Sequence, residues 1–403
     1  PASATPMASA SFRAMPHVPA HPERPSSRLD QHVHFPSGSG SPESVTRVFG
    51  VGKRMTRMDF LFHGLIGGRD DEFALASDQI RCICLVSYKS PWNRHCPAAD
   101  RELAENRSMT GCQRGHLFDR TRRIFALQDT LREWLVDILI RNNVTVIGDG
   151  NTPLVFAHGY GCDQNMWRLI TPDFLSDYKV VLYDLTGSGK SDLGAYDFKK
   201  YSTLEGHATD LIEICDALDL SGAVVVGHSV SAMSAALAAN RQPERFSALV
   251  MVAPSPCYIN DGDYTGGFTP ADIEGLLDFL DTNFLGWSRE MAPAIMGVPD
   301  KPHLAEELTN SFCRTDPSIA QHFGRVTFMS DHRHDAKKVS LPTLILQCSE
   351  DIVAPVAVGE WLQDNIRESQ LVLMNATGHC PHLSAPAETV SAIREFLGAD
   401  ANT

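Results

Sequence analysis

The stretch that decides the fold is VVVGHSVSAMSAALAA, residues 224–239. A β-branched apolar run leads into GHSVS and then directly into an alanine-rich segment. This order is typical of a nucleophile elbow, a tight turn between strand and helix that lifts the hydroxyl of Ser229 above a sheet. The usual pattern has glycine where this chain has Ser231. The alternative interpretation is a serine that caps a helix after a buried strand.

Short apolar runs alternate with helical patterns along the same part of the chain. The runs are PLVFAH (153–158), KVVLYD (179–184), AVVVGH (223–228), ALVMVA (248–253), TLILQC (343–348) and LVLM (371–374). Runs of this kind are typical of parallel strands buried on both faces. The segment STLE, residues 202–205, matches a capping box and predicts a helix start there. The sequence therefore predicts a mostly parallel, doubly wound α/β domain over about 138–398.

The alternation of apolar runs and helical patterns stops between residues 252 and 341, where no strand signal occurs. Helical segments such as PADIEGLLDFLDTNF and PSIAQHFGRVTFM occupy this interval. Helices inserted after a central strand predict a cap over the carboxyl edge of the sheet, where ligands bind in such folds.

The N-terminal third has a different character. Its first 44 residues are rich in Pro, Ser, Ala and His without periodicity, and residues 47–118 follow no consistent period. We therefore expect residues 1–137 to be a largely disordered extension, with a helical pattern beginning near Asp119. Cysteines and histidines in this part match no common zinc spacing, so no metal site is expected; they are Cys82, Cys84, His95, Cys96, Cys112 and His116.

Composition excludes several classes of function. The formal charge of −14 argues against sequence-independent binding to nucleic acid or anionic lipid. No apolar run is long enough to cross a bilayer, and no secretory leader is visible, so a cytoplasmic protein with reduced thiols is expected.

The segment VVLYDLTGSGKSD, residues 180–192, resembles a phosphate-binding loop. That loop needs a glycine five residues before its Gly-Lys-Ser, and Asp184 stands there. The glycines at 187 and 189 are instead expected to let the chain turn out of its strand. No nucleotide cofactor is therefore expected.

A nucleophilic serine needs a base and an acid, which in this fold follow it in the order acid, then histidine. Asp351 comes after the strand TLILQC, and His379 comes after LVLM. Because both follow strand ends, their side chains can meet Ser229 at one edge of the sheet. Glu350 is the competing acid and His382 the competing histidine.

Acyl transfer also needs donors for a developing oxyanion. The segment HGYG, residues 158–161, follows an early strand. In the elbow geometry, the backbone N–H groups of Tyr160 and Val230 point into this oxyanion hole. The side chain of His158 is expected to brace the loop.

These motifs together resemble the RsbQ family of α/β hydrolases, which includes a bacterial sigma-B regulator and the plant karrikin and strigolactone receptors. The resemblance covers about 138–398 and rests on GHSVSAM, HGYGCDQNMW, VVLYDLTGSGKSDL, APSPCYIND, DYTGGF, FCRTDP, SDHR, LILQC and GHCPHLSAP. It implies the α/β-hydrolase fold with a four-helix lid at about 256–330. It also implies Ser229 as nucleophile, His379 as base and Asp351 as the acid that orients it.

The resemblance further implies a small apolar pocket beneath the lid. Its expected walls are Tyr160, Tyr258, Phe268, Trp287, Met291 and Phe328, and His228 is expected to be a wall or a brace. For each aromatic residue, ordinary packing between lid and sheet is the alternative. Met291 falls where the plant receptors have an aromatic residue, which alters the expected pocket shape.

The sequence thus favours a serine hydrolase that cleaves a small apolar ester or lactone, such as a butenolide, without a metal or organic cofactor. The alternative is a ligand-sensing receptor whose lid recruits a protein partner, with slow or incidental hydrolysis. A third interpretation keeps the fold but changes the chemistry, to a cofactor-free haloperoxidase or a C–C hydrolase.

Overall fold

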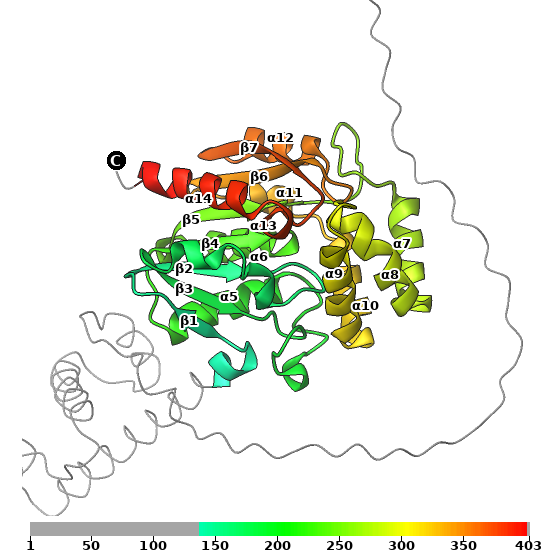
Figure 1. Ribbon diagram of the computed structural model, residues 1–403, viewed down its shortest axis with the longest axis horizontal. Helices are drawn as coiled ribbons and strands as arrows, with labels where there is room; N and C mark the ends of the chain where they lie inside the picture. The colour runs from blue at the N-terminus through cyan, green and yellow to red at the C-terminus, as the bar shows by residue number, and fades with distance from the viewer. Residues whose placement is uncertain (1–136, 401–403) are drawn as a thin grey trace, which may run out of the picture. The chain divides into compact units, whose positions relative to one another are not determined.

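The computed structural model describes residues 137–400 (Figure 1). The predicted N-terminal extension and its cysteine and histidine residues lie outside the described residues. The helical pattern predicted from residue 119 is described only from residue 137, and the chain there is helical to residue 141.

The described residues form a seven-stranded sheet with the order β1-β3-β2-β4-β5-β6-β7. Every neighbouring pair is parallel except β1 and β3. The strands are β1 (Thr145–Ile147), β2 (Thr152–Ala157), β3 (Tyr178–Tyr183), β4 (Ala223–His228), β5 (Phe246–Val252), β6 (Thr343–Glu350) and β7 (Ser369–Thr377). All six predicted strands are present, which confirms the α/β fold class. The sequence missed β1, because a three-residue edge strand without a buried side chain leaves no apolar run to detect.

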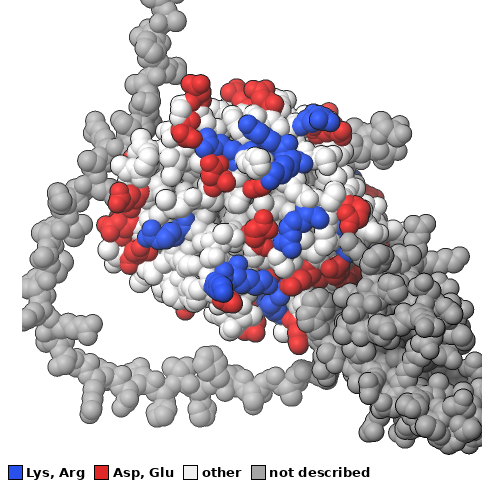
Figure 2. All heavy atoms as spheres, turned by 180° about the vertical axis from the view of Figure 1, so that it is seen from behind, with Lys and Arg blue, Asp and Glu red and all other residues white. Residues whose placement is uncertain are grey.

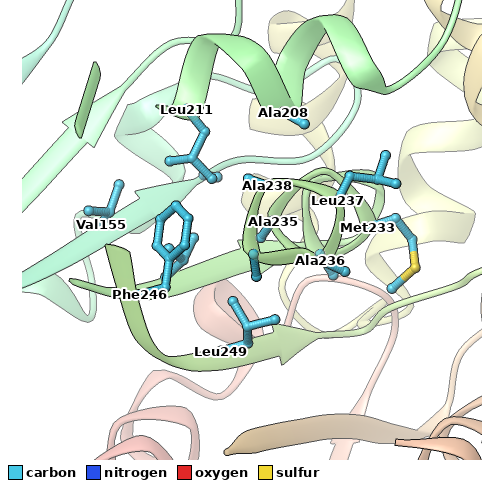
Figure 3. Packing of buried hydrophobic residues seen from close by; sticks show 14 of the residues in the cluster. Val155, Ala208, Leu211, Met233, Ala235, Ala236, Leu237, Ala238, Phe246 and Leu249 are labelled. Carbon is cyan, nitrogen blue, oxygen red and sulfur yellow. The ribbon is translucent and has the colours of Figure 1, made fainter. Parts of the chain in front are cut away.

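Helices cover both faces of the sheet. The longer ones are α5 (Glu205–Ala217), α6 (Val230–Arg241), α12 (Val356–Asn365) and α14 (Pro386–Asp400); the short ones are η1 (Gln164–Trp167), η2 (Thr171–Phe174), η3 (Leu193–Ala195), η4 (Pro243–Arg245), α11 (Arg333–Ala336) and α13 (Pro381–Ser384). One buried cluster joins α5, α6 and α12 to one face, and Figure 3 shows Leu211, Ala235 and Phe246 packed together within it. A second cluster joins η1, η2 and α14 to the other face. Burial on both faces explains why the strands read as continuous apolar runs.

Four helices form the lid predicted between β5 and β6. They are α7 (Pro270–Thr282), α8 (Phe284–Met296), α9 (Pro302–Arg314) and α10 (Pro317–Phe328), and Figure 1 shows them gathered at one end of the sheet. A capping box between Thr269 and Asp272 begins α7. An apolar cluster fills the space between these helices and the loops that follow the strands.

The capping box predicted at residues 202–205 is wrong. Helix α5 begins after Leu204, which makes no side-chain cap. The hydroxyl of Ser202 instead donates to the carbonyl of Lys199 in the preceding turn. Helix α5 begins two residues later than the pattern predicts, so Ser202 is not its N-cap.

No helix within residues 137–400 is long and apolar enough to cross a bilayer. Figure 2 shows basic and acidic side chains interspersed on the face behind that of Figure 1. Mixed signs on this face provide no broad positive surface there.

Candidate active site

Ser229 lies in a strained turn between β4 and α6. Its backbone has φ 55 and ψ −122, and its N–H donates to the Val252 carbonyl at 2.9 Å. A non-glycine residue in such a region costs about 1–3 kcal/mol, which the surrounding structure must offset. Helix α6 turns back so closely that a Cβ on Gly227 would lie 2.7 Å from the Ser231 carbonyl oxygen. The Ser229 hydroxyl makes no capping hydrogen bond, so the alternative interpretation as a helix cap does not hold.

Three buried side chains meet at this turn. The Nε2 atom of His379 lies 2.7 Å from the Ser229 Oγ, and its Nδ1 lies 2.7 Å from the Asp351 Oδ2. Since the acid accepts from Nδ1–H, Nε2 of the neutral ring accepts the serine proton. Asp351 is itself held, because its Oδ1 accepts the N–H groups of Val353 at 2.8 Å and Ala354 at 3.2 Å. The arrangement can pass a proton from a hydroxyl to an imidazole.

The structure distinguishes Asp351 and His379 from the competing acid, Glu350, and the competing histidine, His382. The Glu350 side chain is exposed, and its backbone carbonyl accepts from the Gly378 N–H at 2.7 Å. The His382 ring packs against Trp167 at a tilt of 37° with ring centroids 4.5 Å apart, and neither of its ring nitrogens has a hydrogen-bond partner among the described residues. Burial lowers the pKa of His382 to about 3, so this ring is neutral at physiological pH.

The loop after β2 passes directly beside Ser229. A Cβ on Gly159 would lie 2.5 Å from the His228 Nδ1 and 3.4 Å from the Ser229 Cβ, so only glycine fits there. Neither the Tyr160 N–H nor the Val230 N–H donates to another group in the described part of the chain. Both backbone N–H groups are therefore unpaired within residues 137–400.

His228 braces the loop that carries His379. Its Nε2–H donates to the His379 carbonyl at 2.8 Å, and its ring is buried. Burial, together with the neighbouring rings of His382 and His379, lowers the pKa of His228, which keeps the ring neutral. The structure thus places His228 as a brace between the elbow and the His379 loop.

The sequence missed a direct contact between the lid and the same loop. The His379 N–H donates to the Ile295 carbonyl of α8 at 2.8 Å, and Thr377 Oγ1 donates to the Gly297 carbonyl at 3.0 Å. Gly297 and Gly378 both have positive φ, and a Cβ on Gly378 would lie 1.9 Å from the Met296 carbonyl oxygen. The two glycines were the available signal, but nothing in the sequence indicates that they touch.

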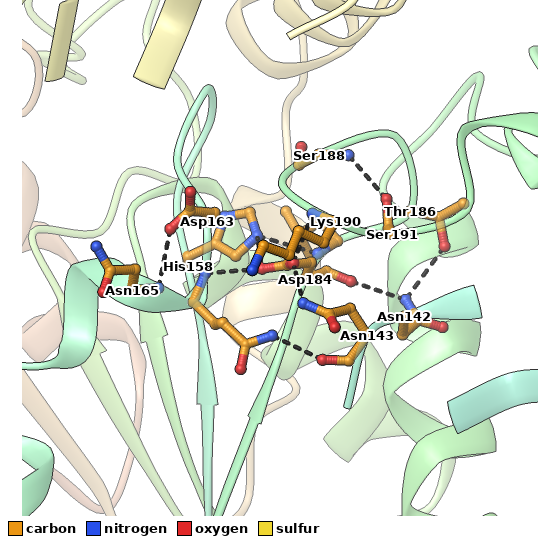
Figure 4. A network of polar contacts seen from close by, with 12 residues as sticks. Asn142, Asn143, His158, Asp163, Asn165, Asp184, Thr186, Ser188, Lys190 and Ser191 are labelled. Carbon is orange, nitrogen blue, oxygen red and sulfur yellow. Dashed lines mark hydrogen bonds and ion pairs between the residues drawn. The ribbon is translucent and has the colours of Figure 1, made fainter. Parts of the chain in front are cut away.

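Asp184 organises the stretch that resembled a phosphate-binding loop. Its buried carboxyl accepts the N–H groups of Gln164 and Lys190, both at 2.8 Å, and the Asn143 side-chain amide at 2.7 Å (Figure 4). Of the backbone amides in this stretch, that of Lys190 donates to the Asp184 carboxylate, and those of Gly187 and Ser188 donate to the Ser191 hydroxyl. No group of three or more His, Cys, Asp or Glu side chains within residues 137–400 is placed to bind a metal ion.

The residues expected to line the pocket lie in the apolar cluster beneath the lid. Its members include Tyr258, Phe268, Trp287, Met291 and Phe328, with Tyr160 packed against it. Burial raises the pKa of Tyr258, whose ring packs edge-on against Phe328 with centroids 5.2 Å apart. A separate surface cavity of about 340 Å³ lies between η1 and α9 and is lined mostly by polar side chains. None of the predicted wall residues lines that cavity.

Comparison with known proteins identifies the family of the chain. A sequence model of the α/β hydrolase family matches residues 154–392. The chain belongs to the α/β hydrolase family. It is 36% identical over 258 residues to karrikin insensitive 2 receptor IA of Petunia hybrida, covering 64% of this chain and 94% of the relative. It is 38% identical over 252 residues to strigolactone esterase RMS3 of Pisum sativum, covering 62% and 94%.

Among solved structures, a hydrolase from Oleispira antarctica is 41% identical with a TM-score of 0.64, covering 66% of this chain and 97% of that one. These relatives confirm the resemblance to the family of karrikin and strigolactone receptors. They also confirm the predicted enzyme class, since relatives at 37% and 38% identity are named strigolactone esterases.

Proposed function

We propose that the protein is a serine hydrolase that cleaves a small apolar ester or lactone. The observation that carries the proposal is the pair of 2.7 Å contacts that join Asp351, His379 and Ser229 at a strained elbow. Strain at this turn supports a functional role, because such backbone conformations cluster at active sites.

The reaction proceeds in two halves. Ser229 Oγ attacks the carbonyl carbon while His379 Nε2 takes its proton, and Asp351 holds the ring and stabilises its charged form. The Tyr160 and Val230 amides bind the resulting oxyanion, each contributing about 2.7–4 kcal/mol. His379 then gives its proton to the leaving oxygen, which departs as an alcohol or as the opened end of a lactone. Water, deprotonated by His379, releases the acyl group and restores the serine.

The substrate class follows from what surrounds the serine. The lid cluster includes Val353 and Cys380, which lie close in the chain to Asp351 and His379, and its apolar and aromatic side chains favour a small apolar substrate over a charged one. The name of the pea relative, strigolactone esterase, supports a lactone-containing ligand, and we propose a butenolide-like compound. Six cysteines in the described residues are free thiols, which supports action in a reducing compartment such as the cytoplasm.

The test is turnover of p-nitrophenyl acetate by wild type, Ser229→Ala and His379→Gln. His382→Gln is the matched control, because His382 lies on α13, three residues after His379, and its ring nitrogens bond to neither Ser229 nor Asp351. We expect the first two variants to lose nearly all activity and the control to keep most of it. Equal rates in wild type and Ser229→Ala would refute catalysis by this serine.

A second candidate is a ligand-sensing receptor that recruits a protein partner at the lid. Two observations favour it: relatives are named receptors, and the lid helix α8 bonds directly to the backbone of His379. Occupancy or slow hydrolysis at Ser229 could then be transmitted to the lid surface through this contact. The test is hydrogen exchange of α7–α10 in Ser229→Ala, with and without a butenolide such as 3-methyl-2(5H)-furanone. A change in amide protection of the lid helices on ligand binding supports a receptor. Unchanged protection with bound ligand rules out this candidate and leaves the hydrolase as the proposed function.

A further inference from the structure

Ser231, the residue that departs from the usual glycine, makes a specific hydrogen bond. It lies on α6 two residues after Ser229, and its side chain is buried. Its hydroxyl donates to the backbone carbonyl of His158 at 2.5 Å. His158 comes at the end of β2, just before the loop that carries the Tyr160 amide. Glycine has no hydroxyl and cannot make this bond.

The ring of His158 holds the next peptide in place. The Leu185 N–H donates to its Nε2 at 3.0 Å, so the proton of the neutral ring is on Nδ1. Burial lowers the pKa of His158, which favours this neutral form. The Nδ1–H therefore donates to the Gly159 carbonyl at 2.9 Å, and Figure 4 shows the ring beside Asp184. The Cys162 N–H donates to the same Gly159 oxygen at 3.2 Å.

These contacts determine where the Tyr160 amide points. The C=O and N–H of a trans peptide point in opposite directions, so holding the Gly159 carbonyl holds the Tyr160 N–H. Ser231 holds the preceding carbonyl, that of His158. Two consecutive peptide planes are thus held, the first of them by the elbow helix itself.

The hydrogen bond also joins the two halves of the oxyanion hole. Val230, the second donor, is the residue before Ser231 on α6, whereas Tyr160 comes from the loop after β2. We propose that Ser231 is a positioning residue, which through His158 holds the Tyr160 amide in register with the Val230 amide. This inference rests on the proposed function, because an oxyanion forms only if Ser229 attacks a carbonyl.

The experiment compares Ser231→Ala with Ser234→Ala in the full chain. Ser234 is the matched control, since it is a buried serine on the same helix whose hydroxyl, among the described residues, donates only to the Val230 carbonyl at 3.5 Å. With p-nitrophenyl acetate, Ser231→Ala should lower kcat about tenfold with KM nearly unchanged, less than the ~10²–10³ that outright loss of a donor costs. Ser234→Ala should leave kcat close to wild type.

A second measurement separates positioning from packing. 2,2,2-Trifluoroacetophenone adds to a serine hydroxyl and places an oxyanion in the hole, so its inhibition constant should rise by about the same factor as kcat falls. Ser231→Gly, which restores the usual glycine, should show the same fall in kcat and the same rise in the inhibition constant. If Ser231→Ala does not fold, this second variant provides the test. Ser231→Thr, which keeps a hydroxyl, should recover most of the loss.

The inference is overturned if both Ser231→Ala and Ser231→Gly match Ser234→Ala in kcat and in the inhibition constant. It is also overturned if the Ser231 variants lower only the melting temperature. In either case the proposed function survives, provided that Ser229→Ala is inactive. Activity retained by Ser229→Ala would instead remove the proposed function and this inference with it.

Discussion

Gly378 lies where the loop that carries His379 crosses the end of lid helix α8. Its φ is +77, and a Cβ there would lie 1.9 Å from the Met296 carbonyl oxygen. In Gly378→Ala the left-handed backbone costs about 1–2 kcal/mol and the forced displacement a further 1–3 kcal/mol. We therefore expect the free energy of unfolding, measured in urea, to fall by about 2–5 kcal/mol.

The same substitution should also reduce catalysis, because His379 is the next residue in the chain. A shift of the imidazole by about 1 Å can cost roughly 10²-fold in rate, so kcat for p-nitrophenyl acetate should fall by about that factor. Gly222→Ala is the control, since Gly222 has φ +63 and open space where a Cβ would be added. The control should lose only the backbone cost and keep its kcat. Equal losses of stability and kcat in the two variants would show that the contact between α8 and the His379 loop does not matter.

Three further perturbations test other parts of the site. Asp351→Asn should lower kcat by roughly 10⁴, because the amide favours the wrong tautomer of the His379 imidazole. Glu350→Gln changes an exposed side chain and should leave kcat nearly unchanged. Similar losses of kcat in both variants would contradict the assignment of Asp351 as the acid. His207 is buried between two aromatic rings, and burial lowers its pKa to about 4 from 6.5. Between pH 6.5 and 4 His207 is therefore protonated in the unfolded chain but neutral in the folded protein. The free energy of unfolding should have its full value above pH 6.5 and fall by roughly 3 kcal/mol as the pH drops toward 4. Measured by urea unfolding across this range, the free energy of unfolding of His207→Phe should depend less on pH than that of wild type. An unchanged pH dependence would show that protonation of His207 is not its cause. Tyr160→Phe removes the hydroxyl that donates to the Ala320 carbonyl of α10 at 2.8 Å. It should lower the free energy of unfolding by about 1 kcal/mol and leave kcat unchanged, because the proposed oxyanion donor is the Tyr160 backbone amide. A large loss of kcat would count against that role of the amide.

The sequence predicted those features that depend on local pattern and chain order. Buried parallel strands leave continuous apolar runs, and each reactive side chain follows such a run, so Ser229, Asp351 and His379 could be placed at one sheet edge. The structure brings the three together. It also distinguishes Asp351 from Glu350, which the sequence could not do, because neighbouring residues at a strand end differ only in side-chain direction.

Features that depend on contacts between distant segments were not predictable. The hydrogen bond from Ser231 to His158 spans 73 residues, and the contact of Gly378 with Met296 joins a sheet loop to the lid. The capping box at 202–205 failed because residues 201–204 form turns and bends and α5 begins only after Leu204, an alternative that the local pattern does not exclude. The apolar cluster beneath the lid was indicated by residue type, but its shape depends on how four helices pack together.

The most direct test of the central claim is to label the protein with a fluorophosphonate and map the adduct by peptide mass spectrometry. The reagent reacts with a serine hydroxyl activated by a neighbouring base, losing fluoride as the O–P bond forms. We predict a single adduct on Ser229 in wild type and its near-complete loss in His379→Gln. An adduct on another residue with Ser229 unmodified, or hydrolysis by a protein that the reagent does not label, would contradict the proposal.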